Sequence, residues 1–253
     1  LMVFDTMGGQ LGRSAAEDAV VAESDIIIGP LFSGAVAEAK AVADAANIPM
    51  LLLSNNALVA SKGSWLMGYL PEQQLDLLLG HAIADGRKRF AIIAEDSPFG
   101  KRLATHAKRR LVQSGLHAED SMVLGKRALE SEDLLKRAIR NFSRYVPPVE
   151  GEIISKKPPV FDVLIFAGGA EFALRTAPLL AYYDLGSDAV MYLGNAQWNQ
   201  RKILSEPSLQ KGLYAFRSSN TDDQFVEKWN AVWTDKPGLL SRLSFDAVAI
   251  AEV

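Results

Sequence analysis

The chain alternates short, continuous apolar runs with helix-length amphipathic stretches, and this alternation restricts its fold more than any other feature of the sequence. Runs such as "DIIIG" and "RFAIIAE" are typical of strands that are covered on both faces. Strands separated by helices predict parallel sheets built from βα units. The predicted strands are 1–4, 25–29, 50–54, 65–70, 89–95, 162–168, 190–195 and 212–216. The predicted helices are 9–23, 34–46, 71–85, 99–115, 131–145, 171–183, 222–234 and 240–253.

Composition excludes several classes of protein. The 253 residues carry a formal net charge of −3, whereas a nucleic-acid-binding protein usually needs a basic face. The absence of cysteine excludes disulfides, thiolate metal sites and cysteine nucleophiles. No apolar run approaches the roughly 18 residues of a membrane span. We therefore predict no nucleic-acid partner and no transmembrane segment in this chain.

The common catalytic and cofactor motifs are missing. The glycines of "MGGQLG" (7–12) lack the GxGxxG spacing, and "GPLFSGA" (29–35) lacks the lysine of a phosphate loop. No GxSxG elbow is present, and no ligand spacing connects the three histidines. We predict no catalytic residues, no metal site and no cofactor, and therefore a protein that is not an enzyme.

The order of these pieces resembles the type I periplasmic binding protein fold, the family that includes the branched-chain amino acid receptors such as Leu/Ile/Val-binding proteins. The matching segments are 26–56, 65–74, 89–104, 161–175, 193–198, 212–216 and 244–253. Three stretches, "YLPEQQ", "GRKRFAIIAEDSPFG" and "LLAYYDLG", are similar to a narrower branch, the penicillin-binding-protein activators among bacterial envelope lipoproteins.

The resemblance implies a two-lobed α/β protein in which each lobe is a parallel sheet flanked by helices. Lobe 1 would comprise residues 1–70 and 217–253, and lobe 2 residues 71–216, with hinges near 70–71 and 216–217. Segment 1–4 would correspond to the second strand of lobe 1, so the first strand is missing from the chain. We expect roughly 30–40 further residues upstream of Leu1, since a βαβ unit needs about that many. A lipid-bearing cysteine would lie in that upstream part.

Ligands of open α/β sheets bind beyond the carboxyl ends of the strands. Helix N-termini at Ser33 and Glu171 would offer backbone N–H groups there. Ser33 has two open interpretations, either as part of the cleft lip or as a cap of the following helix. The predicted ligand-binding residues are Phe32, Ser33, Ser54, Asn55, Asn56, Asp96, Phe99, Glu171, Asn195, Gln197 and Trp198.

The predicted ligand chemistry departs from that of the amino acid receptors. Those proteins hold the ligand ammonium with an acidic side chain, whereas Asn195, Ala196 and Gln197 occupy the matching positions here. A buried ammonium without an anionic partner costs several kcal/mol, although Asp96 or Glu171 could substitute.

We therefore predict a non-catalytic periplasmic protein that binds a penicillin-binding protein, a peptidoglycan synthase, and regulates peptidoglycan synthesis. The alternative is the substrate-binding component of an ABC transporter, with a permease as partner and an amino acid or another small polar ligand in the cleft. A third interpretation, a cytosolic sensor domain of the sugar-repressor kind, lacks a DNA-binding segment.

Overall fold

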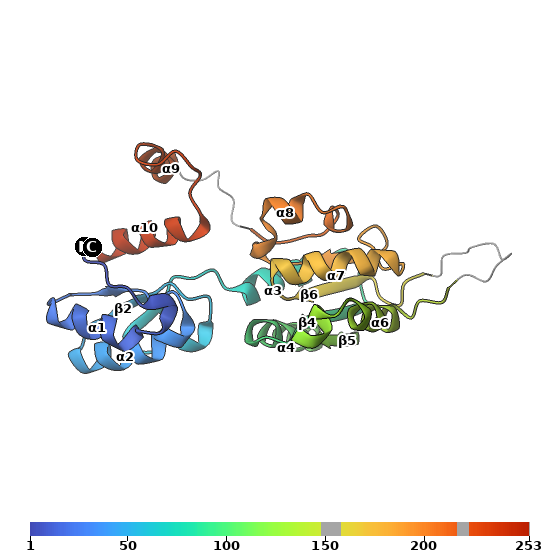
Figure 1. The fold of residues 1–253 in the computed structure, drawn as a ribbon, viewed down its shortest axis with the longest axis horizontal. Coiled ribbons are helices and arrows are strands. Elements are labelled where there is room, and N and C mark those ends of the chain that lie inside the picture. The colour runs from blue at the N-terminus through green and yellow to red at the C-terminus, as the bar shows by residue number, and fades with distance from the viewer. Residues whose placement is uncertain (148–157, 217–222, 253) are drawn as a thin grey trace. The chain divides into compact units, whose positions relative to one another are not determined.

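The computed structural model describes residues 1–147, 158–216 and 223–252 (Figure 1). Backbone contacts divide the chain into two compact units. Unit 1 comprises Leu1–Leu70 and Ser218–Val253, and unit 2 comprises Pro71–Arg217. These boundaries lie close to the predicted lobe boundaries, and the hinge role of the two connections stays a prediction.

Unit 1 contains a three-stranded parallel sheet of order β1-β2-β3. The strands are β1 (Ile27–Ile28), β2 (Met50–Leu52) and β3 (Ser64–Leu66). The helices are η1 (Met7–Gly9), α1 (Gly12–Val21), α2 (Ser33–Ala46), η2 (Ala57–Val59), α9 (Asp223–Asn230) and α10 (Leu239–Ala251).

Small residues let the helices of unit 1 pack closely. A Cβ added to Gly12 of α1 would lie 2.6 Å from the carbonyl oxygen of Ala35 in α2. The core of this unit joins these two helices to β2 through Ala16, Val36, Ala39, Ala43, Met50 and Leu52.

Unit 2 contains a four-stranded parallel sheet of order β5-β4-β6-β7. The strands are β4 (Phe90–Glu95), β5 (Ala118–Leu124), β6 (Val163–Ala167) and β7 (Met191–Leu193). The helices are α3 (Pro71–Ala84), α4 (Pro98–Gln113), α5 (Lys126–Glu130), α6 (Glu132–Ser143), α7 (Ala170–Tyr182), η3 (Ala196–Trp198), α8 (Arg201–Leu204) and η4 (Pro207–Leu209). β5 lies on one side of β4, and the next strand, β6, lies on the other side. The order in which strands are added to the sheet therefore reverses at β4.

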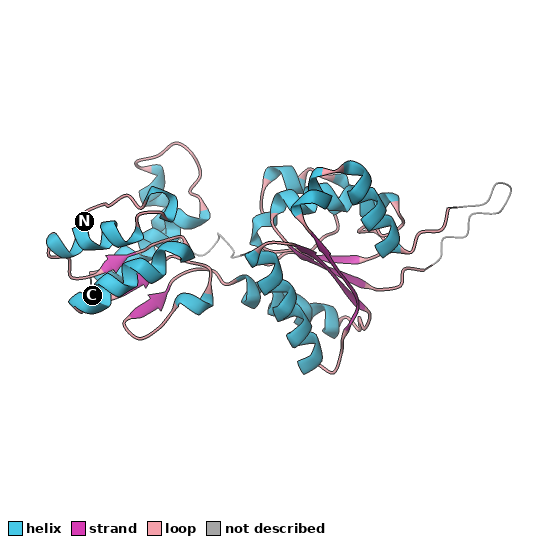
Figure 2. Cartoon of the chain, turned by 60° about the horizontal axis from the view of Figure 1, so that its bottom comes forward, coloured by secondary structure: helices cyan, strands magenta, loops and turns pink. Residues whose placement is uncertain are grey.

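Helices cover both faces of the unit 2 sheet, which explains its continuous apolar strands (Figure 2). Successive side chains of a strand point to opposite faces. Phe90 and Ile92 of β4 belong to the core cluster formed with α3 and α4. Ala91 and Ile93 belong to the cluster formed with α6 and α7.

The predicted α/β class with parallel sheets flanked by helices is confirmed. The predicted strand 1–4 is wrong, because these residues pair with no strand among the described residues and the side chains of Leu1 and Val3 are 99% and 88% exposed. Segment 212–216 forms only a single parallel bridge, between Leu193 and Leu213. The sequence reasoning missed β5 and α5. Most of the predicted loop 146–160 lies outside the described residues.

Candidate functional site

The first loop at the carboxyl edge of the unit 2 sheet follows β4. Ser97 caps α4, since its Oγ accepts a hydrogen bond from the Gly100 N–H at 3.1 Å and donates one to Glu95 Oε2 at 3.2 Å. Asp96 forms an ion pair with Lys101 and lies beside Gly125, the residue that follows β5. The loops after β4 and β5 are therefore adjacent at this edge.

Phe99 lies in the first turn of α4 and carries the guanidinium of Arg102 over its ring, 5.8 Å from the centroid. Arg102 Nε also donates to Glu72 Oε1 of α3 at 2.7 Å. The second carboxylate oxygen, Glu72 Oε2, is buried without a hydrogen-bond partner among the described residues. Sequence reasoning missed Glu72 and Arg102, because they come from helix interiors that no strand-end rule marks.

The loop after β6 leads into α7. Gly169 is the N-cap of this helix and no side chain caps it, so the first N–H groups of α7 lack a capping bond. Gly168 must be a glycine, because an added Cβ would lie 2.5 Å from Cδ1 of Phe172. Glu171 pairs with Lys202 at 3.4 Å, and both side chains are exposed.

The loop after β7 is held by Asn195. Its Nδ2 donates to the Gly168 carbonyl at 2.9 Å and its Oδ1 accepts from the Gln197 N–H at 3.0 Å, which ties the β6 and β7 loops together. The side chain is buried, at 2% exposure. Gln74 of α3 accepts a hydrogen bond from the Ala196 N–H at 2.9 Å. Sequence reasoning missed Gln74, which has no signal in its own spacing.

Trp198 belongs to the hydrophobic core of unit 2. It is 1% exposed, and its ring packs edge-on against Phe166 at 5.3 Å. Gly194 and Gly212 make room for the indole, because a Cβ on either would lie within 2.6 Å of it. Asn195 and Trp198 are therefore buried and hold the loop after β7 in place, and their predicted contact with a ligand stays a prediction.

Unit 1 places its predicted residues in the loops after β1 and β2. Phe32 is exposed and occupies the N-cap position of α2, where no side chain caps the helix. Ser33 is the first residue of α2, so the interpretation of Ser33 as the cap is wrong. Its hydroxyl is exposed and so fits the interpretation of Ser33 as part of a lip.

Ser54 is buried and its Oγ accepts from the Asn56 N–H at 3.2 Å, while Asn56 Oδ1 accepts from the Leu58 N–H at 3.2 Å. Asn55 between them is exposed. Gly68 fits closely against this loop, since an added Cβ would lie 1.9 Å from the Ser54 carbonyl oxygen. The amide of Asn56 and the hydroxyl of Ser54 thus first of all shape their own loop.

The two sets of loops offer backbone N–H groups, amides, hydroxyls and an aromatic ring, which are the groups that hold a small polar ligand without covalent chemistry. Among the described residues, no three histidine, aspartate or glutamate side chains cluster as metal ligands. No helix in the described part of the chain combines the length and apolar content that crossing a membrane requires.

The model of a protein family described as periplasmic binding protein matches residues 5–136. No curated protein matches the chain.

Solved structures match over nearly the whole chain. An ABC transporter substrate-binding protein from Desulfitobacterium hafniense has a TM-score of 0.74 at 16% identity, over 98% of this chain and 70% of that chain. A leucine-binding protein from Thermotoga maritima has a TM-score of 0.66 at 14% identity, over 99% and 69%. A solute-binding protein from Rhodopseudomonas palustris, in complex with 3,4-dihydroxybenzoic acid, has a TM-score of 0.68 at 14% identity, over 96% and 65%. At these identities the likeness shows the fold, a type I periplasmic binding protein fold.

Proposed function

We propose that this chain is the substrate-binding component of an ABC transporter and works in the periplasm with a permease as its partner. The premise is that the chain belongs to the periplasmic binding protein family. The observation that carries the proposal is the family match over half of the chain. The similar structures from Desulfitobacterium hafniense and Rhodopseudomonas palustris are named as ABC transporter components. We therefore prefer transport to the regulatory function that the sequence favoured.

The ligand class follows from the acidic side chains at the unit 2 edge. Among the predicted ligand-binding residues, Asp96 and Glu171 are the two carboxylates that could hold an ammonium, and both already pair with lysines, Lys101 and Lys202. An amino acid would have to share one of these carboxylates with its lysine. The N-terminus of α7 lacks a side-chain cap and favours an anion. We therefore infer a small carboxylic acid without an α-ammonium group.

The named ligands of similar proteins are consistent with a carboxylate. The proteins from Thermotoga maritima and Rhodopseudomonas palustris carry the names of leucine and 3,4-dihydroxybenzoic acid, and both of these molecules contain a carboxyl group. Only the second lacks an ammonium, and it is the better model for the ligand of this chain.

A thermal-shift screen against aromatic acids, aliphatic acids and the twenty amino acids tests the proposal. A ligand at about 100 times its dissociation constant stabilises the folded protein by roughly 2.7 kcal/mol, which should raise the melting temperature by about 5–10 °C. We expect the shift with an acid that lacks the ammonium. The variant Asp96→Asn should keep that shift, because Asp96 already pairs with Lys101.

If an amino acid raises the melting temperature and Asp96→Asn or Glu171→Gln abolishes that rise, the inferred ligand class is wrong and the transport function stands. No shift with any acid or amino acid would count against transport itself.

The second candidate is the penicillin-binding-protein activator-like regulator of peptidoglycan synthesis, anchored by an upstream lipid. The loop after β7 favours it, because Asn195 is committed to hydrogen bonds within the protein and no carboxylate stands in that loop. Biolayer interferometry with a purified peptidoglycan synthase tests it. A saturable response without any small-molecule shift would put this candidate ahead.

A further inference from the structure

A basic groove on unit 2 lies apart from the loops described above. It is lined by Lys136, Arg137, Arg140, Asn141, Arg144, Tyr145 and Tyr183. Helices α6 and α7 both end before the strands that follow them begin, so their C-terminal ends lie at the amino edge of the parallel sheet. The candidate loops lie at the opposite, carboxyl edge. The groove is therefore a separate surface.

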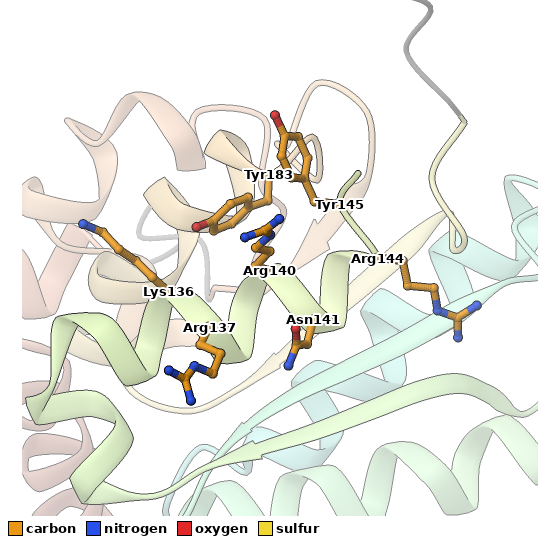
Figure 3. Close-up of a pocket in the computed structure, with 7 residues that line it drawn as sticks. All are labelled: Lys136, Arg137, Arg140, Asn141, Arg144, Tyr145 and Tyr183. Carbon is orange, nitrogen blue, oxygen red and sulfur yellow. The ribbon is translucent and has the colours of Figure 1, made fainter. Parts of the chain in front are cut away.

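The packing of α6 explains why its cations face outward. Leu135, Ile139 and Phe142 are buried in the core with spacings of four and three residues, which fixes one face of the helix inward. Lys136, Arg137 and Arg140 fall outside that face and are exposed. Figure 3 shows Arg140 pointing toward Tyr145 and Tyr183, with Lys136 beside them and Arg137 and Asn141 on another flank of the helix.

The groove has more positive charge than its neighbours neutralise. Lys136 pairs with Glu132 at 2.5 Å, and Arg144 pairs with Asp120 at 3.5 Å. Arg137 and Arg140 form no ion pair with any described residue. This local excess stands out in a chain whose net charge is −3.

Stabilisation of the helix by cations near its C-terminus explains only some of the positive charges of the groove. Cations in the last turn of a helix interact favourably with its dipole, and Arg140 occupies that turn in α6. The effect falls off within one turn, so it does not explain Arg137.

The two tyrosines give the groove an aromatic wall. The ring centroids of Tyr145 and Tyr183 are 5.3 Å apart, and those of Tyr182 and Tyr183 are 4.9 Å apart. The side chain of Tyr182 is 72% exposed. Arginine and tyrosine are among the residue types enriched in protein–protein contacts, where a planar guanidinium binds a carboxylate with two hydrogen bonds.

We propose that this groove binds an acidic segment of a partner protein. From Arg137 to Ser143, the last residue of α6, the helix rises by about 9 Å, since each residue adds about 1.5 Å. Carboxylates at alternate positions of an extended segment are about 7 Å apart, so two of them fit within this length. Arg140 binds one carboxylate beside the two tyrosines, which cover the backbone of the segment, and Arg137 binds a second carboxylate on the neighbouring flank of the helix. The proposal goes beyond the transport function and does not depend on it.

Fluorescence anisotropy with the full chain and a labelled octapeptide of glutamates tests this proposal. We expect saturable binding that weakens as salt rises from 50 to about 300 mM, because exposed charge pairs are screened. The double variant Arg137→Ala/Arg140→Ala should weaken binding by about tenfold or more. The matched control Lys108→Ala/Lys211→Ala removes the same charge from exposed lysines outside the groove and should bind as the parent does.

Equal losses in the two double variants, or no binding of the peptide, would overturn the proposal. Sedimentation with vesicles of anionic phospholipid and titration with inorganic phosphate separate the other anions. Binding to vesicles or phosphate without binding to the peptide would assign the groove to a lipid surface or a small anion and overturn the proposal. Loss of peptide binding with an unchanged response to small carboxylic acids would separate this groove from the transport site.

Discussion

At the scale of single residues, the pair Arg89–Asp162 fixes the amino ends of β4 and β6. The Arg89 guanidinium donates from Nε to Asp162 Oδ1 at 3.1 Å and from Nη1 to the Pro159 and Val160 carbonyls at 3.0 and 3.2 Å. Burial alone would raise the pKa of the Asp162 carboxyl, but the hydrogen bonds and charge of Arg89 outweigh burial and hold the pKa below its ordinary value of 3.8. The pair therefore stabilises the folded state while the carboxylate stays ionised.

Asp162→Asn should lower the free energy of unfolding by about 1 kcal/mol at pH 7, a modest value because the Arg89 side chain is 45% exposed. A carboxyl with a depressed folded-state pKa contributes its full stability above the unfolded pKa. That contribution is lost as pH falls below 3.8 through the lower folded value. Urea melts at pH 7 and pH 3 should show the difference between variant and parent shrinking at the lower pH. A constant difference, or an equal loss in the exposed control Asp188→Asn, would contradict this account.

The same scale shows what the sequence could tell about the site. The rule that ligands lie beyond strand ends led to the loops that hold Asp96, Glu171 and Asn195. It could not tell a side chain that faces solvent from one that holds the loop together. Trp198 points inward because Gly194 and Gly212 leave space for its ring. Asn195 points inward because its amide donates a hydrogen bond to the Gly168 carbonyl. Both are tertiary contacts, which the strand-end rule does not predict.

At the scale of elements, Gly100 lets α4 start close to the ends of β4 and β6. An added Cβ would lie 2.2 Å from the Glu95 carbonyl oxygen and 2.7 Å from that of Ala167. Both neighbours are backbone atoms of central strands, so they cannot move aside as a flexible side chain would. The first turn of α4 and the two strand ends therefore depend on one another.

Gly100→Ala should cost about 2–3 kcal/mol, in the range of overpacked core positions. Gly80 in α3 is the matched control, because an added Cβ there meets nothing within 4 Å. Gly80→Ala should be neutral or stabilise by up to about 1 kcal/mol, since glycine is a poor helix residue. Chemical denaturation of both variants checks the pair. Similar effects at the two positions would contradict the close packing of α4 on the sheet.

Elements also show where sequence patterns fail. The central strands β4 and β6 were found because both faces are covered, whereas β5 was missed because its residues alternate between partly buried and exposed. An edge strand packs on fewer neighbours, and "AEDSMVL" (118–124) therefore lacks a continuous apolar run. The opposite error occurred at 1–4, where an apolar run forms no strand because β-structure also needs a backbone partner.

At the scale of the whole molecule, unit 2 has the features of an independent domain: a continuous chain, a complete sheet and a core on each face of that sheet. Its chain is continuous from Pro71 to Arg217, and all four strands of its sheet lie within those bounds. Both of its core clusters, one on each face of the sheet, draw only on residues of the same unit. Unit 1 combines two separate segments of the chain instead.

Residues 71–217 should accordingly fold when expressed alone. We expect a single cooperative thermal transition by circular dichroism and a calorimetric enthalpy equal to the van't Hoff value, as for a two-state domain. Gly100→Ala should destabilise this fragment by the same amount as the full chain, because the atoms nearest to the added Cβ belong to Glu95 and Ala167 of unit 2. A fragment with helical signal but no cooperative transition, or one in which Gly100→Ala has no effect, would show that unit 2 depends on the rest of the chain for its packing.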